Sequence, residues 1–169
     1  MKVIVVTGTP GTGKTTLSKS LAQRLNFLYL DANKFILKNK LSQGYDKKRK
    51  TKIVDVGKLN KALINEISLL KINKKNKISS GIIIDSHLSH YLPKKYVDLC
   101  IVTKCSIKEL NKRLKKKKFH TEKIKENIEA EIFDICYNEA LQRKHDILVV
   151  DTSASRKILT QKVLKFFQK

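Results

Sequence analysis

The sequence predicts an α/β fold in which a five-stranded parallel sheet lies between two layers of helices, a three-layer αβα sandwich. Short apolar runs alternate along the chain with segments of helical periodicity, a pattern typical of a parallel sheet covered on both faces. The first apolar run leads into Gly8-Thr9-Pro10-Gly11-Thr12-Gly13-Lys14-Thr15, which has the full spacing of a phosphate loop. The chain has 169 residues, of which 41% are hydrophobic, so a single domain with a sizeable core is expected.

The phosphate loop at residues 8–15 indicates a P-loop NTPase that binds a nucleoside triphosphate. Its glycines allow backbone N–H groups to surround the β- and γ-phosphates, and the positive end of the following helix lies beneath the same oxygens. We expect Lys14 to bridge the phosphates and the Thr15 hydroxyl to hold Mg²⁺. The helix after the loop has an apolar inner face, formed by Leu17, Leu21, Ala22 and Leu25.

The first half of the chain is expected to contain three strands and three helices. In order, these are a strand at 2–7, a helix from the phosphate loop to about Leu25, a strand at 27–31, a short helix at 32–42, an amphipathic helix at 56–72 and a strand at 81–85. The segment 42–52 is polar, contains Gly44 and has no period, which predicts a surface loop. Residues 73–77 are expected to break the amphipathic helix.

The second half is expected to complete the sheet. The elements predicted there are a strand at 97–102 set off by Pro93, helices at 106–117 and at 121 to about 144, a strand at 147–150, and a helix at the end of the chain. Ligands of such sheets bind at the carboxyl ends of the strands. Thr7 and Asp85 are both expected at such ends.

Asp85 and His87 are the candidate site residues outside the phosphate loop. An apolar strand that ends in Asp is the usual second half of a P-loop nucleotide site, where the carboxylate reaches Mg²⁺ directly or through water. His87 follows two residues later, so it points to the same side and is a candidate for placing a water or an acceptor. The alternatives are an Asp that caps a turn and an ordinary loop histidine. His90, His120 and His145 have no comparable context.

The chain is strongly basic, with 37 Lys and Arg against 15 Asp and Glu and a formal net charge of +22. Such a potential attracts polyanions, RNA above all. A biased composition is an equal alternative, because Lys, Ile and Asn are abundant together and only five basic residues are Arg.

The three cysteines, Cys100, Cys105 and Cys136, lack the spacing of metal ligands, so they are expected to be small apolar residues in a reducing compartment. There is no long uncharged apolar run and no signal-peptide pattern before the first strand. We therefore expect a soluble, unprocessed cytoplasmic protein without a membrane partner.

A GTPase is disfavoured, because Asn73-Lys74-Lys75-Asn76 lacks the Asp of the guanine-reading motif and Leu88 stands where a glycine is needed. Motors and helicases need a longer chain. A small kinase that closes over a pair of nucleotides fits the length best.

The chain resembles the atypical adenylate kinase family of archaea and eukaryotic nuclei, whose members include the coilin-interacting nuclear ATPase. The matching segments are collinear and cover nearly the whole chain. They are the phosphate loop through Leu17, Gly44-Tyr45-Asp46, Asp85-Ser86-His87, Leu92-Pro93, Arg113-Leu114 and 122–132. The Asp-x-His motif and the Glu-Asn-Ile-x-Ala-Glu-Ile helix are more particular to the family than the phosphate loop.

The resemblance implies a nucleoside monophosphate kinase fold with a short lid at about 113–123 and a monophosphate-binding region at about 30–53. The remaining core would be 1–29, 54–112 and 124–169. It also implies transfer from ATP to AMP or another monophosphate, ATP hydrolysis, and a role in small ribosomal subunit maturation through a uS11-type ribosomal protein. The nucleotide contacts implied are Gly11, Gly13, Lys14, Thr15, Thr16, Lys117 in the lid and Arg156 on the base side.

Two departures from the family bear on activity. Lys117-Lys118-Phe119 replaces the Arg-Gly-Tyr of the family's lid, and an ammonium cannot bind phosphate oxygens in the planar, bidentate way of a guanidinium. Loss of an arginine finger costs about 10³–10⁵ in rate, unless Arg113 substitutes. In addition, the segment 47–50 is basic where the family is usually acidic, and such a segment could bind either an acceptor phosphate or small-subunit rRNA.

The segment 122–139 has isoleucines at helical spacing and six acidic residues. A solvated acidic face opposite a core stripe is the favoured interpretation, and a docking face for a basic ribosomal protein is the other. Two functions therefore remain open: a metabolic kinase with Lys14, Asp85, His87 and Arg113 as its catalytic residues, or an assembly ATPase with little kinase activity. A nucleotide-sensing module without turnover is the least favoured.

Overall fold

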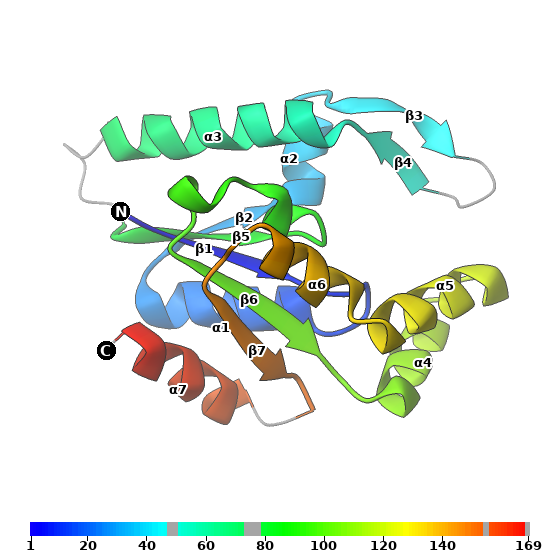
Figure 1. The fold of residues 1–169 in the computed structure, drawn as a ribbon. Coiled ribbons are helices and arrows are strands. Elements are labelled where there is room, and N and C mark those ends of the chain that lie inside the picture. The colour runs from blue at the N-terminus through cyan, green and yellow to red at the C-terminus, as the bar shows by residue number, and fades with distance from the viewer. Residues whose placement is uncertain (47–50, 73–78, 154–155, 168–169) are drawn as a thin grey trace.

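The computed structural model describes residues 1–46, 51–72, 79–153 and 156–167, and it confirms the predicted fold class. The central sheet has five strands in the order β2-β5-β1-β6-β7, and every neighbouring pair is parallel (Figure 1). The strands are β1 (Lys2–Thr7), β2 (Leu28–Asp31), β5 (Gly81–Asp85), β6 (Leu99–Lys104) and β7 (Ile147–Asp151). All five lie close to the apolar runs that the sequence predicts as strands.

Helices cover both faces of this sheet (Figure 1). On one face α1 (Lys14–Leu25) and α7 (Arg156–Phe167) bury apolar side chains against alternate residues of the central strands. On the other face α2 (Ala32–Lys38), α3 (Val56–Ile72) and α6 (Ile135–Gln142) pack on the remaining residues. None of the helices in the described segments is long and apolar enough to cross a membrane.

The carboxyl edge of the sheet brings together residues that are far apart in the sequence. Asp85 pairs in register with Val6 of β1 and with Asp31 of β2. The phosphate loop follows β1 directly, so Asp85 and Asp31 lie beside its base. β1 lies between β5 and β6, at the point where the order of the strands changes direction. In open α/β sheets, ligands bind outside the carboxyl ends of the strands at such a point.

The polar segment 42–52 is not a loop throughout, contrary to the sequence-based prediction. It forms an antiparallel hairpin of β3 (Ser42–Asp46) and β4 (Thr51–Val54), with a register shift between Ser42 and Gly44. Ser42 to Tyr45 are all exposed, so neither face of β3 carries the alternating apolar pattern that reveals a strand. The basic residues 47–50 lie outside the described residues, and so does the predicted break at 73–77.

The helix predicted from 121 to about 144 is also wrong in one respect, because the structure has two helices there. α5 (Thr121–Ile132) ends before Asp134, whose φ of 53° lies in the left-handed region and starts α6 at a new angle. This break changes the expected core stripe: Ile124 is buried, but Ile132 and Ile135 are 58% and 42% exposed. Asp134 itself forms an ion pair with Lys104.

Two short 3₁₀ helices, η1 (Ser89–Tyr91) and η2 (Lys94–Tyr96), connect β5 to β6. The segment after β6 forms α4 (Ile107–Lys116), whose N-cap is Ser106. α4 packs against α5 through a small cluster around Leu110, Leu114 and Ile124.

The backbone conformation at the end of α4 explains why glycine suits position 118 of the expected lid. The backbone N–H of Phe119 donates to Leu114 O at 3.3 Å and that of Lys118 donates to Lys115 O at 2.9 Å, which is the Schellman arrangement. In this motif the residue at position 118 is left-handed, and Lys118 has a φ of 56°. Glycine is the residue that adopts this conformation without a steric cost, and the resembled family has glycine at this position.

Lys118→Gly is therefore expected to stabilise the protein, by about 0.5 kcal/mol. An L-residue in the left-handed conformation costs about 1–2 kcal/mol, and glycine removes this strain. The greater freedom of glycine in the unfolded chain costs about 0.5–1 kcal/mol in return. Lys118→Val, with a β-branched side chain, should destabilise instead. Denaturant unfolding of the three proteins measures both effects, and a Val variant as stable as the Gly variant would contradict this account.

Candidate functional site

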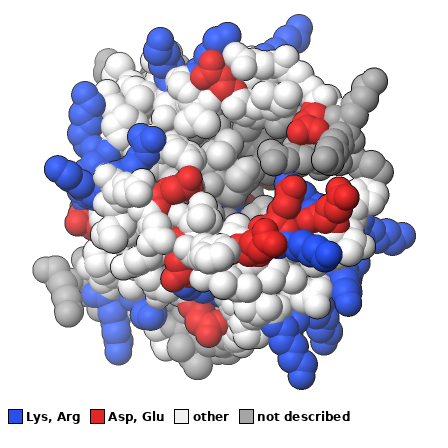
Figure 2. Space-filling model, turned by 45° about the vertical axis from the view of Figure 1, so that its right-hand side comes forward, with Lys and Arg blue, Asp and Glu red and all other residues white. Residues whose placement is uncertain are grey.

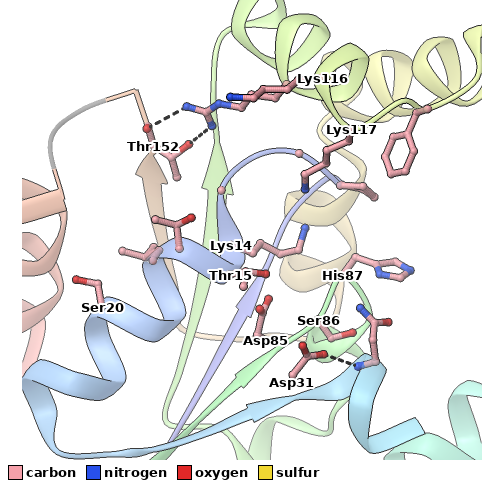
Figure 3. A pocket seen from close by; sticks show the side chains of 18 of the residues that line it. Lys14, Thr15, Ser20, Asp31, Asp85, Ser86, His87, Lys116, Lys117 and Thr152 are labelled. Carbon is pink, nitrogen blue, oxygen red and sulfur yellow. Dashed lines mark hydrogen bonds between the residues drawn. The ribbon is translucent and has the colours of Figure 1, made fainter. Parts of the chain in front are cut away.

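A cavity of about 1080 Å³ opens at the carboxyl edge of the sheet. Its walls come from the phosphate loop, the start of α2, the end of β5 and the segment after it, the end of α4, and the turn after β7 (Figure 3). Most of the predicted site residues line it: Gly11, Gly13, Lys14, Thr15, Thr16, Asp85, His87, Arg113 and Lys117. Gly8 lies at the base of the loop. The side chain of Arg156 is outside the described part of the chain.

The phosphate loop is held in shape by its glycines and by contacts with β6. Gly8 has a φ of 135°, and a Cβ atom there would lie 2.4 Å from the backbone oxygen of Thr103. The Thr12 hydroxyl lies 2.7 Å from the Thr103 hydroxyl and 2.8 Å from the backbone oxygen of Thr9. Thr103 in turn donates to the backbone oxygen of Thr7 at 3.1 Å. The loop is thus fastened to the sheet on its inner side and open toward the cavity.

Lys14 lies across the opening of this loop. Its Nζ donates to the backbone oxygens of Gly8 at 2.7 Å and Thr9 at 3.0 Å, and Figure 3 shows the side chain pointing into the cavity. Burial lowers the pKa of Lys14 from 10.5 to about 8, although the nearby Cys136 and Asp85 act in the opposite direction. A bound phosphate would add negative charge beside the ammonium group and raise this pKa again.

Nucleotide binding is therefore expected to depend on pH through Lys14. Below pH 8 the ammonium is already charged and affinity should be constant. Above it, binding must take up a proton, so the Kd for Mg·ATP should rise about tenfold between pH 7 and pH 9. Calorimetry in two buffers of different ionisation enthalpy counts that proton. Lys14→Arg, which stays charged throughout, is the control, and an equal rise in its Kd would remove Lys14 as the cause.

Asp85 lies below Lys14 and beside Thr15 (Figure 3). It is only 5% exposed, and the phenol of Tyr29 in β2 donates to its Oδ2 at 3.0 Å. Burial and the neighbouring Asp85 carboxylate raise the pKa of Tyr29 far above 10, so the phenol keeps its proton and remains a donor. A carboxylate and a hydroxyl are hard oxygen donors of the kind that Mg²⁺ prefers, so Asp85 and Thr15 have the chemistry of a site that phosphates would complete.

His87 projects into the cavity from the segment after β5 (Figure 3). His87 is an exposed residue that lines the cavity, and the neighbouring cavity walls displace part of the water around it. This desolvation, followed by the charge of Lys14, lowers the pKa of His87 to about 4. The imidazole is therefore neutral at pH 7 and can accept a hydrogen bond from a water or hydroxyl group.

Arg113 and Lys117 approach from α4 on the opposite wall. The Arg113 guanidinium donates to Glu109 at 2.8 Å and to the Thr152 hydroxyl at 3.0 Å. Thr152 donates to the backbone oxygen of Thr12 at 2.6 Å, so Arg113 is fastened to the phosphate loop through one residue. Lys117 points toward Lys14 (Figure 3), and its charge is one of the causes that lower the pKa of Lys14.

Sequence reasoning missed several residues of this site. Tyr29 and Thr152 contact Asp85 and Arg113, and Asp31 and Asn33 line the cavity near Ser86. Asp31 caps α2 by accepting from the N–H groups of Asn33 and Lys34, a pattern visible in the sequence only as a strand that ends in Asp. The contacts of Tyr29 and Thr152 depend on which strands are neighbours.

The comparisons with known proteins agree with this geometry. A family model described as an AAA domain matches residues 4–134. The adenylate kinase isoenzyme 6 homolog of Caenorhabditis elegans is 32% identical over 146 residues, which is 86% of this chain and 76% of that protein. The chain belongs to the family of the adenylate kinase isoenzyme 6 homologues. The homolog FAP7 of Saccharomyces cerevisiae is 33% identical over 155 residues, 91% of this chain and 74% of that protein.

Solved structures show that this family shares its fold with other small kinases. Deoxyadenosine kinase from M. mycoides, with bound dATP, has a TM-score of 0.59 at 17% identity and covers 100% of both chains. Shikimate kinase from Acinetobacter baumannii, in complex with shikimate, has the same TM-score and identity over 99% of this chain and 93% of that one. At this identity the likeness shows the fold alone. The relatives described above confirm that the chain belongs to the adenylate kinase family that its sequence resembles.

Proposed function

We propose that this protein is a nucleoside monophosphate kinase of the adenylate kinase type, which transfers the γ-phosphoryl group of ATP to AMP. The observation that carries the proposal is the single cavity that joins the phosphate loop to Asp85, His87, Asp31 and Asn33. One end offers backbone N–H groups and cations for a triphosphate, and the other offers polar groups for an acceptor. The names of the family relatives, adenylate kinase isoenzyme 6 homologues, support the same reaction.

The donor end is assigned to ATP. The phosphate loop, with Gly8, Gly11 and Gly13, would surround the phosphates together with Thr16 in the first turn of α1, and Lys14 would neutralise charge on the β- and γ-oxygens. Thr15 and Asp85 would hold Mg²⁺, which when bound neutralises developing charge and orients the phosphates. Because phosphoryl transfer asks little covalent chemistry of the protein, these residues act by positioning and charge stabilisation.

The acceptor end is assigned to the monophosphate. His87, neutral at pH 7, would orient the attacking oxygen, and the region 30–53 would enclose the acceptor. Arg113 and Lys117 would close over the transferred group from the lid at 113–123, and Arg156 would contact the base of ATP. The remaining segments, 1–29, 54–112 and 124–169, form the core in this assignment.

An ATPase switch in small ribosomal subunit maturation is the second candidate function. Lys117 in place of a lid arginine favours it, since slow transfer to an acceptor leaves water as the competing nucleophile. The partners would be a uS11-type ribosomal protein and small-subunit rRNA, as the likeness to the coilin-interacting nuclear ATPase implies. The net charge of +22 supports contact with RNA, although basic side chains project all around the visible face in Figure 2 rather than gathering in one patch.

The acidic segment 122–139 offers less surface for a basic partner than the sequence suggests. Glu131 accepts from the backbone N–H of Cys105, Asp134 pairs with Lys104, and Glu139 binds His90 and Tyr91. Glu126 also pairs with Lys123 at 3.2 Å, so at least four of the six carboxylates have partners within the protein.

Product chromatography of the purified protein with Mg·ATP, alone and with each nucleoside monophosphate, tests these functions. Diphosphate formed from both nucleotides, dependent on AMP, is the expected result. Slow release of ADP and inorganic phosphate regardless of acceptor would reject the kinase in favour of the ATPase switch. Turnover by Lys14→Ala equal to that of the wild type would reject the phosphate loop as the place of the reaction.

A further inference from the structure

A buried histidine outside the cavity connects segments that carry the site. His90 lies in η1, is 1% exposed, and is not used in the mechanism above. Its Nδ1 lies 2.7 Å from Oγ1 of Thr7, the last residue of β1, and its Nε2 lies 2.9 Å from Oε2 of Glu139 in α6. These contacts span 83 and 49 residues of sequence, respectively.

The chemistry of the partners assigns the protons. The Glu139 carboxylate can only accept, so Nε2 of His90 carries the hydrogen and donates. Burial is the largest influence on the pKa of His90 and lowers it, although Glu139 opposes this, so the ring is neutral at pH 7. Nδ1 is then an acceptor, and the Thr7 hydroxyl donates to it. The Tyr91 phenol occupies the other Glu139 oxygen at 2.6 Å.

The other charged and titratable groups around His90 leave this arrangement in place. His145 Nε2 lies 2.8 Å from the backbone oxygen of His90, and the Arg143 guanidinium lies over the Tyr91 ring at 4.7 Å. Both add positive charge nearby when protonated, which further favours the neutral form of His90. Every polar atom of the His90 ring therefore has a partner, and such a fully satisfied buried network favours one geometry.

Thr7 is where this network meets the phosphate loop. The next residue, Gly8, accepts from Lys14 Nζ at 2.7 Å through its backbone oxygen, and Cys136 of α6 lies close enough to Lys14 to act on its pKa. The Thr7 hydroxyl also lies 3.4 Å from the backbone oxygen of His87, but its one proton is donated to Nδ1 of His90, so this is a contact and not a second hydrogen bond. One hydroxyl thus stands between the loop that holds Lys14 and the segment that presents His87, and α6 supports both.

We propose that His90 is a positioning residue for phosphoryl transfer: bonded to Thr7 and Glu139, it fixes the phosphate loop and the His87 segment relative to each other against α6. The inference rests on the proposed function at this site. It concerns Thr7, His90 and Glu139, which do not line the nucleotide cavity. Because a misplacement of about 1 Å can cost about a hundredfold in rate, loosening this network should slow transfer more than it weakens binding.

Thr7→Val tests the proposal, since Val has nearly the shape of Thr and lacks the hydroxyl. We expect kcat to fall about tenfold to a hundredfold, with the KM for ATP changed less than about threefold on the same argument. Thr7→Ser retains the hydroxyl and should restore most of the rate. A Val variant with the kcat of the wild type, or a Ser variant as slow as the Val variant, would overturn the proposal.

A spectroscopic readout separates this test from the proposed function. In the wild type at pH 7, ¹⁵N NMR of His90 should show a protonated Nε2 and an unprotonated, hydrogen-bonded Nδ1, and Thr7→Val should shift the Nδ1 signal. A proton on Nδ1 would overturn the arrangement whatever the activity. Wild-type protein that transfers no phosphoryl group, with the expected spectrum, would reject the proposed function and with it the positioning role, while the hydrogen-bond network itself would stand.

Discussion

Lys14→Ala is expected to lower the rate of phosphoryl transfer about 10²–10³-fold, the range for removing one preorganised donor from a developing charge. The fold should persist, because Lys14 is only partly buried and its Nζ makes hydrogen bonds with the loop's own backbone, to Gly8 and Thr9, and with no other residue that the structure describes. Stability should change by less than about 1 kcal/mol, since each lost hydrogen bond contributes about 0.5–1.5 kcal/mol and the desolvation of a partly buried ammonium is removed at the same time.

Steady-state kinetics and denaturant unfolding of the same preparation measure the two effects. Lys61→Ala is the matched control: it removes an exposed lysine from α3, on a helix that does not line the cavity. It should leave kcat unchanged. If Lys14→Ala keeps kcat within about threefold of the wild type, well inside the range for one donor, the phosphate loop is not where transfer takes place.

The elements that the sequence predicts correctly are those with a buried face. The runs at Val3–Val6 and Ile82–Ile84 are apolar because β1 and β5 are covered on both sides, and the spacing of Leu59, Leu63 and Ile67 reflects the one face of α3 that packs on the sheet. The residues of the phosphate loop are also predictable from sequence, because they are consecutive and a single turn of the backbone directs them toward one ligand.

What the sequence does not reveal depends on neighbours that are distant along the chain. β3 has no buried face, so no alternation marks it. The break at Asp134 is a single left-handed residue inside a continuous helical pattern. Tyr29 reaches Asp85 only because β2 pairs with β5, and no local feature of the chain sets that strand order.

His90 shows the same limit at the site. In the sequence it is one histidine among four, and a buried position for it is no more expected than an exposed one. Its proposed role depends on Thr7 and Glu139, which the fold brings to the two ring nitrogens of His90. Residues that position other residues are in general harder to find from sequence than those that bind the ligand, because their partners are not in the motif.

Asp85→Asn is expected to lower kcat by about two to three orders of magnitude. A bound metal ion supplies several kcal/mol of charge stabilisation, and each 1.36 kcal/mol is tenfold in rate. If Asp85 holds the ion, as we propose, losing its charge removes a large part of that stabilisation. Asn is isosteric with Asp, and its amide oxygen still accepts from Tyr29. The position of the side chain is thus kept while its charge is lost, and the Mg²⁺ concentration for half-maximal rate should rise.

Asp31→Asn is the control that makes the result specific to the metal. Asp31 lies in the same cavity and in register with Asp85 on the next strand, and Asn caps a helix as well as Asp does, so α2 should remain in place. If Asp85 holds the metal and Asp31 faces the acceptor, only Asp85→Asn changes the Mg²⁺ dependence, and Asp31→Asn acts on the KM for the monophosphate. Equal Mg²⁺ curves for wild type and Asp85→Asn would remove Asp85 from the metal site. Both variants shifting the curve would instead mean that the two carboxylates share the ion, because they are neighbours at one edge of the sheet.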